Sequence, residues 1–240
     1  MKQFPIIILH GWGLSGARFD GLSKVFKNLG YRVYTPDLPG FGQSQIPEKP
    51  LHLRDYAVFL KQYLQENRLG PVILLGHSFG GRVSIKFQEL YPKDVRAIIL
   101  SGTPGFVPVN RIKLMVAIFA AKIGKLPFLL PGLSKFEERA RLLAYRMVGA
   151  KDYLRATDSM RQTFKNIVRE RLDSGMKKIT VPTLLLWGSE DQIVKIAIAR
   201  KMARTIPHAK FLAVTSAKHS YPYDNPVDFA GQADEFLCHL

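Results

Sequence analysis

The stretch that decides the fold reads Val72-Ile73-Leu74-Leu75-Gly76-His77-Ser78-Phe79-Gly80-Gly81. Its first four residues form an apolar run that predicts a strand buried on both faces. Residues 82–90 follow with the pattern of an amphipathic helix. The G-x-S-x-G between them predicts a sharp turn with a strained backbone at Ser78, where glycines two residues away let chains pass closely. This context presents the Ser78 hydroxyl at a helix N-terminus above the strand ends, a position suited to a nucleophile.

Short apolar runs alternate with longer amphipathic stretches on both sides of this motif, which is typical of a parallel sheet covered by helices. The alternation breaks once, because residues 103–178 show only helical pattern punctuated by prolines. We therefore predict an α/β core formed by residues 1–102 and 179–240, with an all-helical cap at 103–178 inserted after the strand that ends near Leu100. The predicted strands are 5–9, 31–35, 72–75, 97–100, 183–187 and 210–214.

A serine nucleophile needs a base to take its proton and an acid to orient that base. In a strand–turn–helix serine motif the chain order is Ser, acid, His. Three histidines follow Ser78. His219 comes shortly after the last predicted strand, at the sheet edge that holds Ser78. His208 precedes that strand and falls at the opposite end, and His239 is the penultimate residue, so His219 is the predicted base.

The acid is sought in the loop Trp187-Gly188-Ser189-Glu190-Asp191, which follows the strand at 183–187. Asp191 lies 28 residues before His219, at the same edge of the sheet. Its neighbour Glu190 is the competing carboxylate, and an outward salt bridge suits it better. The loop after Leu100 offers no carboxylate, so Asp191 is the predicted acid.

A tetrahedral intermediate also requires N–H donors aimed at its oxyanion. One donor is expected to be the backbone N–H of Phe79, directly after the nucleophile. The other is expected from the loop His10-Gly11-Trp12-Gly13 after the first strand, through the N–H of Trp12. The Trp12 side chain is also predicted to form a wall of the pocket.

With these motifs the chain resembles the α/β-hydrolase superfamily and, within it, small capped serine esterases. The resemblance also rests on the segments Asp37–Ser44 and Gly188–Val194, and on His219 followed by Asp224-Asn225-Pro226. The resemblance covers nearly the whole chain outside the cap. It implies an α/β-hydrolase fold with a mostly parallel sheet of about six strands. The leading antiparallel hairpin of the family is expected to be absent, because Met1 lies just before the family's third strand. We interpret Asp37–Ser44 as a structured loop.

The resemblance implies hydrolysis of carboxylic esters through an acyl-enzyme on Ser78, with His219 as general base and Asp191 as orienting acid. Serine at position 78 argues against haloalkane dehalogenases and epoxide hydrolases, which use Asp there. Lactonase, thioesterase, acyltransferase and C–C bond hydrolase activities remain alternatives on the same triad, and a non-enzymatic binding module is the alternative of another class. No metal-ligand spacing or nucleotide loop occurs, so no metal and no cofactor are expected.

The predicted substrate pocket combines Trp12, Leu14 and Phe79 with Leu114 and Ile118 from the apolar face of the cap. The substrate is expected to be a small acyl ester. Opposite this apolar face the cap is basic, with Arg111, Lys122, Lys125, Lys135, Arg139 and Arg146. A solvated surface is one explanation. The alternative is recruitment of an acidic carrier protein, because the start of the chain is similar to that of carrier-protein methyl esterases of biotin synthesis, or of an anionic membrane surface.

The composition agrees with an ordinary globular enzyme: 47% of the 240 residues are hydrophobic and 22% are charged. The net charge of +16 comes from 35 Lys and Arg against 19 Asp and Glu. A proteome-wide excess of basic residues accounts for this charge as well as any partner does. No nucleic-acid motif accompanies it. The N-terminal apolar stretch is too short for a signal peptide and no run could span a bilayer, so a cytoplasmic location is expected.

Overall fold

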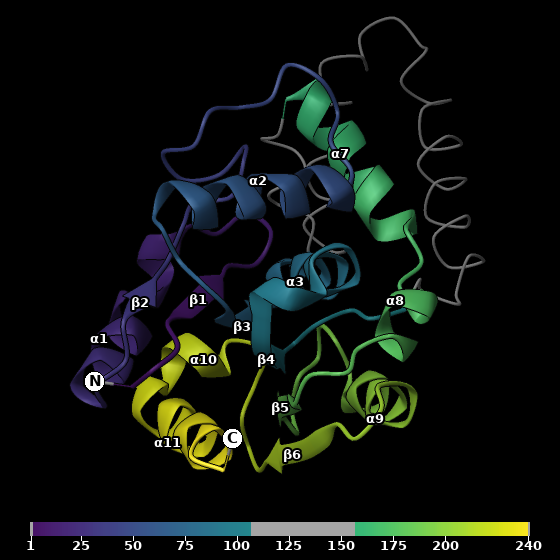
Figure 1. Ribbon diagram of the computed structural model, residues 1–240. Coiled ribbons are helices and arrows are strands. Elements are labelled where there is room, and N and C mark those ends of the chain that lie inside the picture. Colours follow the sequence, from purple (N-terminus) through teal and green to yellow (C-terminus); the bar gives the residue numbers. More distant parts are fainter. Residues whose placement is uncertain (1, 107–156, 240) are drawn as a thin grey trace, which may run out of the picture.

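The computed structural model describes residues 2–106 and 157–239. In these residues six parallel strands form one sheet in the order β2-β1-β3-β4-β5-β6 (Figure 1). The strands lie where the sequence predicts them. The edge strand β2 is shorter than expected because it pairs with β1 at only two positions. The strands are β1 (Ile6–Leu9), β2 (Val33–Tyr34), β3 (Val72–His77), β4 (Val95–Ser101), β5 (Thr183–Gly188) and β6 (Lys210–Val214).

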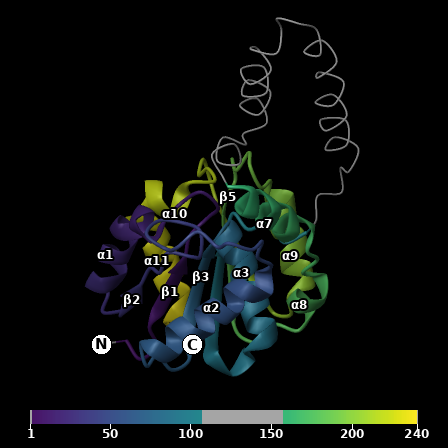
Figure 2. The same cartoon turned by 90° about the horizontal axis from the view of Figure 1, so that it is seen from above.

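Helices cover both faces of the sheet, so the predicted parallel sheet between two helical layers is confirmed (Figures 1 and 2). One layer contains α1 (Asp20–Asn28), α10 (Tyr221–Asp224) and α11 (Pro226–Leu237). The other contains α2 (Leu53–Glu66), α3 (Phe79–Leu90), α7 (Asp158–Arg169), α8 (Asp173–Lys177) and α9 (Ile196–Thr205). Two short 3-10 turns, η1 (Gly16–Phe19) and η2 (Pro92–Asp94), precede α1 and β4.

The core is divided by the sheet into two hydrophobic clusters. Ile7 and Leu9 of β1 point into the cluster with α2 and α3, whereas Ile6 and Ile8 point into the cluster with α1 and α11. Alternate side chains of a strand point to opposite faces, so a strand covered on both sides must be apolar throughout. Each fully buried Ile or Leu contributes roughly 1.5–3 kcal/mol to folding.

The strand order reverses between β1 and β3, at their carboxyl ends. From β1 the chain goes to β2 on one side, and β3 then joins β1 on the other side. At such a switch point the two loops diverge and leave room for a ligand. The loop after β1 contains Trp12, and the turn after β3 contains Ser78. The loops after β5 and β6 carry Asp191 and His219 to the same edge.

The predicted cap at 103–178 is described only at its two ends, residues 103–106 and 157–178. The described part after residue 157 is helical: α7 and α8 lie there, and Met160, Ile167 and Met176 are buried in the cluster with α2 and α3. Residues 107–156 lie outside the described residues. The division into core and cap therefore stays a prediction.

Candidate active site

Ser78 occupies the sharp turn between β3 and α3. Its φ of 51° and ψ of −112° lie outside the usual regions for a side-chain-bearing residue, which costs about 1–3 kcal/mol. The Ser78 N–H donates to the Ser101 carbonyl at 2.8 Å and so ties the turn to β4. A Cβ on Gly76 would lie 2.5 Å from the Cα of Gly81, and one on Gly80 would overlap the Leu9 carbonyl. The glycines on either side of Ser78 are therefore required by close chain approach.

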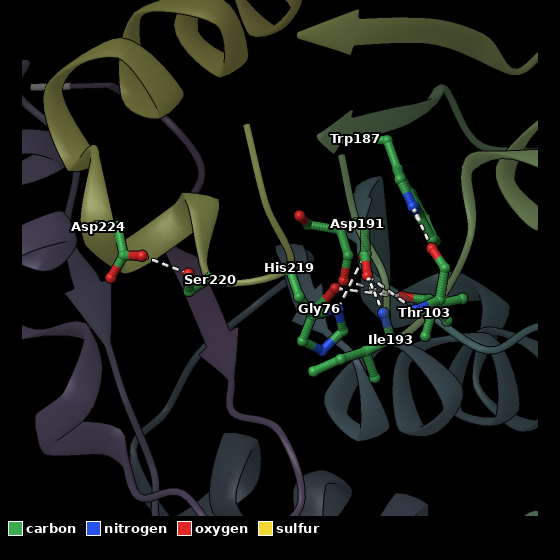
Figure 3. Close-up of polar contacts among 10 residues, drawn as sticks. Gly76, Thr103, Trp187, Asp191, Ile193, His219, Ser220 and Asp224 are labelled. Carbon is green, nitrogen blue, oxygen red and sulfur yellow. Dashed lines mark hydrogen bonds and ion pairs between the residues drawn. The ribbon is translucent and has the colours of Figure 1, made fainter. Parts of the chain in front are cut away.

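Asp191 and His219 are brought together from the loops after β5 and β6 (Figure 3). His219 Nδ1 donates to Asp191 Oδ2 at 2.8 Å. The other carboxylate oxygen, Oδ1, accepts the N–H groups of Ile193 and Val194, each at 2.8 Å. The Asp191 side chain is 1% exposed and that of His219 is 13% exposed. The Asp191 carboxylate is thus held by three hydrogen bonds, and in the tautomer that donates from Nδ1, His219 Nε2 is the acceptor.

Backbone hydrogen bonds join the two loops that carry this pair. Ser189 N–H donates to the Val214 carbonyl and Glu190 N–H donates to the Ala217 carbonyl, both at 2.9 Å. A Cβ on Gly188 would overlap the Ala217 carbonyl, so only glycine allows the loops to approach this closely. Glu190 itself is exposed. The structure therefore separates the two neighbouring carboxylates, with one inside the site and one in solvent.

The His219 ring lies beside the turn that carries Ser78. Its centroid is 4.7 Å from that of His77, the residue before Ser78. Gly102 also lies close to this ring, because a Cβ there would be 2.6 Å from His219 Cε1. Gly102 has a φ of +57°, so its backbone conformation also favours glycine. Within the described residues, the Ser78 hydroxyl makes no side-chain hydrogen bond, to His219 or to another group.

The two predicted oxyanion donors belong to Phe79, which follows Ser78, and to Trp12 in the loop after β1. Phe79 is the first residue of α3, and the first N–H groups of a helix have no intrahelical acceptor. In the loop after β1, a Cβ on Gly11 would lie 3.4 Å from Ser78 Cβ, so this loop passes directly over the serine. Trp12 N–H donates to no backbone acceptor in the described part of the chain. Both N–H groups are thus available.

His10 and Asp37 support the loop after β1, and neither role is apparent from the sequence. His10 Nε2 accepts the Leu38 N–H at 3.0 Å, so its proton is on Nδ1, which donates to the Gly11 carbonyl at 2.8 Å. Asp37 accepts Gly16 N–H at 2.7 Å and Gln43 N–H at 2.9 Å. These bonds agree with the interpretation of Asp37–Ser44 as a structured loop.

An aromatic wall borders the site. The Trp12 ring makes edge contacts with Phe41, Phe79 and Phe164, with centroids 4.8–5.5 Å apart. Next to it is an open hollow of about 500 Å³. Its lining comprises Gly13, Leu14, Ser15, Arg18, Gly40, Phe41 and Gly42. Of the predicted pocket residues, Trp12, Leu14 and Phe79 therefore border this region, and Leu114 and Ile118 lie outside the described residues.

Two buried histidines make the stability of the protein depend on pH. Burial lowers the pKa of His10, and burial together with the nearby His219 lowers the pKa of His77 well below the usual value. Both side chains therefore take up a proton less readily in the folded protein than in the unfolded chain. The unfolded chain takes up protons on these residues below about pH 6.5. Because the unfolded state then binds more protons, the free energy of unfolding falls as the pH falls below that value.

We expect the free energy of unfolding to decrease between pH 7 and pH 5, with each of the two histidines adding a slope of up to about 1.4 kcal/mol per pH unit below pH 6.5. Urea unfolding at pH 5, 6 and 7 measures this slope. His77→Phe keeps a ring among Phe19 and Tyr223 and removes one titrating group. A slope in His77→Phe equal to that of the wild type would contradict the assignment.

The described residues contain no group of three or more His, Cys, Asp or Glu side chains that could hold a metal ion. Cys238 is a free, exposed cysteine. Within residues 2–106 and 157–239, every helix is too short or too polar to cross a membrane. The basic residues predicted for the cap, Arg111, Lys122, Lys125, Lys135, Arg139 and Arg146, lie outside the described residues.

Comparison with known proteins places this geometry in a family. Residues 3–224 match the family model described as serine aminopeptidase, S33. The chain is 26% identical to Lipase 1 of Psychrobacter immobilis over 230 residues, which cover 90% of this chain and 71% of the lipase. It is also 26% identical to a 2-hydroxy-6-oxononadienedioate/2-hydroxy-6-oxononatrienedioate hydrolase of Burkholderia vietnamiensis, with 97% of this chain and 86% of that protein covered.

Solved structures show the same fold. An esterase from Exiguobacterium antarcticum superposes with a TM-score of 0.76 at 22% identity, covering 98% of this chain and 92% of the esterase. A bromoperoxidase from Bacillus anthracis also superposes with a TM-score of 0.76, at 20% identity and with the same coverage. At these identities the likeness concerns the fold alone. The family match over residues 3–224, together with this fold, identifies the chain as an α/β hydrolase of the S33 serine aminopeptidase family.

Proposed function

We propose that this chain is a carboxylic-ester hydrolase that acts through an acyl-enzyme on Ser78. The observation that carries the proposal is the pair formed by His219 and the buried Asp191, whose second oxygen is held by two backbone N–H groups. This pair lies next to a serine in a strained turn. A serine becomes a nucleophile when an oriented imidazole takes its proton, and the proposal assigns this role to His219.

In the proposed reaction, His219 Nε2 takes the hydroxyl proton as Ser78 Oγ attacks the ester carbonyl. The negative charge that develops on the carbonyl oxygen is stabilised by the N–H groups of Phe79 and Trp12. His219 then gives the proton to the alcohol as the C–O bond breaks, and Ser78 is left acylated. A water molecule repeats the attack, again with His219 as base, and releases the acid.

Ester substrates are favoured by two considerations. The aromatic wall formed by Trp12, Phe41, Phe79 and Phe164 is suited to an apolar acyl group. Relatives over most of the chain carry the name lipase. Lactones and thioesters would react by the same steps, and an acyltransferase would replace water with another nucleophile.

A series of p-nitrophenyl esters from acetate to palmitate tests the proposal. We expect turnover with a distinct optimum of acyl length, because the aromatic wall binds a limited apolar group. Aminoacyl p-nitroanilides, which probe the activity for which the family is named, serve as the comparison and are expected to react at least tenfold more slowly. If folded protein hydrolyses none of the esters, the proposal fails.

Cleavage of a C–C bond beside a ketone is the second candidate. It is favoured by the match to the Burkholderia hydrolase, which covers 86% of that protein and 97% of this chain. The same Ser78, His219 and Asp191 would serve it. A 2-hydroxy-6-oxo-dienoate consumed faster than any ester would make this the better assignment. Recruitment of an acidic carrier protein stays a prediction from the sequence, because the basic residues on which it depends lie outside the described residues.

A further inference from the structure

Arg82 is a buried cation on the helix that begins beside the nucleophile. It lies four residues after Ser78 and is 3% exposed. Its Nη2 donates to the Ile167 carbonyl at 2.8 Å and to the Glu170 carbonyl at 2.5 Å, and its Nη1 donates to the Pro104 carbonyl. Burial lowers the pKa of Arg82 to about 10, so it is still charged at neutral pH. A buried guanidinium is costly unless its hydrogen bonds are satisfied, and here backbone carbonyls satisfy most of them.

Two of the three carbonyls belong to the C-terminal end of α7. Ile167 is in the last turn of that helix, and Glu170 is its C-cap residue. The last carbonyls of a helix lack intrahelical partners and form the negative end of its dipole, so a cation is favoured there. The third carbonyl, that of Pro104, follows β4. Arg82 therefore joins the described chain on both sides of residues 107–156.

The side chain of Glu170 strengthens the same junction. Its Oε1 is 3.1 Å from Lys86 Nζ, which lies one turn after Arg82 on α3. Its Oε2 accepts the Leu53 N–H at the start of α2, at 3.2 Å. The end of α7 is thus held to α3 through two carbonyls and one carboxylate.

The α7 helix also carries part of the aromatic wall. Phe164 lies one turn before Ile167, and its ring centroid is 5.0 Å from that of Trp12. Trp12 contacts Phe79, the residue after Ser78, at 5.5 Å. A helix of three turns moves as a rigid unit, so a shift of its C-terminal end carries Phe164 with it. The position of Phe164 over Trp12 therefore depends on what holds the end of α7.

We propose that Arg82 is a positioning residue that sets the acyl-chain selectivity of the site, because it fixes α7, and with it Phe164, against the helix that begins beside Ser78. Arg82 touches no reacting atom in this scheme. The substrate part of the inference rests on the proposed ester hydrolysis, and the positional part does not.

Arg82→Met keeps an unbranched side chain as far as the level of Nε and removes the guanidinium with all its donors. With this variant we expect kcat/KM for the preferred long-chain ester, relative to acetate, to fall about tenfold, mainly through a rise in KM. The matched control is Phe26→Leu, which disturbs the hydrophobic cluster on the other face of the sheet. This control is expected to lower the melting temperature and to leave the ratio of kcat/KM for the long-chain ester to kcat/KM for acetate unchanged. All assays are made where circular dichroism shows each variant to be folded.

Phe164→Ala completes a double-mutant cycle. Alone it should lower the same ratio by a similar factor, and the double variant Arg82→Met/Phe164→Ala should lower it no further, because both changes remove the same wall. Fluorescence gives a readout without catalysis. The chain has two tryptophans, and Trp187 is fully buried. We therefore expect acrylamide to quench the fluorescence of Arg82→Met more strongly than that of the wild type, and we assign the increase to Trp12.

Equal losses on acetate and on the long ester, as from general destabilisation, would overturn the proposal. Additive effects in the cycle, or quenching identical to that of the wild type, would also overturn it. If the wild type hydrolyses no ester at all, the proposed function fails by itself, and the quenching measurement still decides whether Arg82 positions α7.

Discussion

Ser78→Ala is expected to lower kcat for the best p-nitrophenyl ester by about 10⁶-fold, the scale found when the nucleophile of a serine hydrolase is removed. The substitution deletes the only atom that forms the acyl-enzyme bond. In the proposed mechanism the N–H groups of Phe79 and Trp12 still bind the carbonyl oxygen of this variant's substrate, so a residual rate of about 10³–10⁴ over water is expected. Stopped assays over several hours, with freshly purified variant, measure this residual rate.

The matched control for this variant is Ser174→Ala, an exposed serine on α8. It should keep kcat within a factor of two, because alanine is well accommodated in a helix. A fluorophosphonate supplies a second readout: it should add its mass to the peptide that contains Ser78 in the wild type and leave Ser78→Ala unlabelled. Turnover at the wild-type rate in Ser78→Ala would remove this serine from the mechanism.

The residues of the candidate triad can be predicted from the sequence because each follows a strand that is itself recognisable. Strands covered on both faces require continuous apolar runs, and β3, β4 and β5 show such runs. The carboxyl ends of parallel strands share one edge, so His219 after β6 and Asp191 after β5 must lie at the same side as Ser78. Local pattern and topology together are enough for these three positions.

The supporting residues cannot be predicted in this way, because their roles arise from contacts between distant segments. His10 joins the loop after β1 to Leu38, and Arg82 joins α3 to the end of α7. In the sequence, His10 is part of a loop motif and Arg82 is one basic residue of a helix. Gly102 has no motif at all, although its missing side chain makes room for the His219 ring. Only the folded arrangement shows which atoms these residues meet.

Asp191→Asn is expected to lower kcat about 10⁴-fold with little change in the geometry of the site. The reason lies in the second oxygen of the carboxylate. The N–H groups of Ile193 and Val194 both donate to Asp191 Oδ1, and they require an acceptor at that place. An asparagine must therefore put its oxygen there and turn its NH₂ group towards His219 Nδ1.

This arrangement forces the wrong tautomer on His219. Nδ1 must then accept the hydrogen bond, so the proton of the neutral ring moves to Nε2, the atom that takes the proton of Ser78 in the proposed mechanism. Nitrogen-15 chemical shifts of the His219 ring measure the tautomer directly. In Asp191→Asn they should show the proton on Nε2, whereas in the wild type they should show it on Nδ1. Glu190→Gln, one residue away and exposed, is the control and should keep both the tautomer and kcat within a factor of two of the wild type. A kcat for Asp191→Asn close to that of the wild type, with the tautomer changed, would show that His219 Nε2 is not the base.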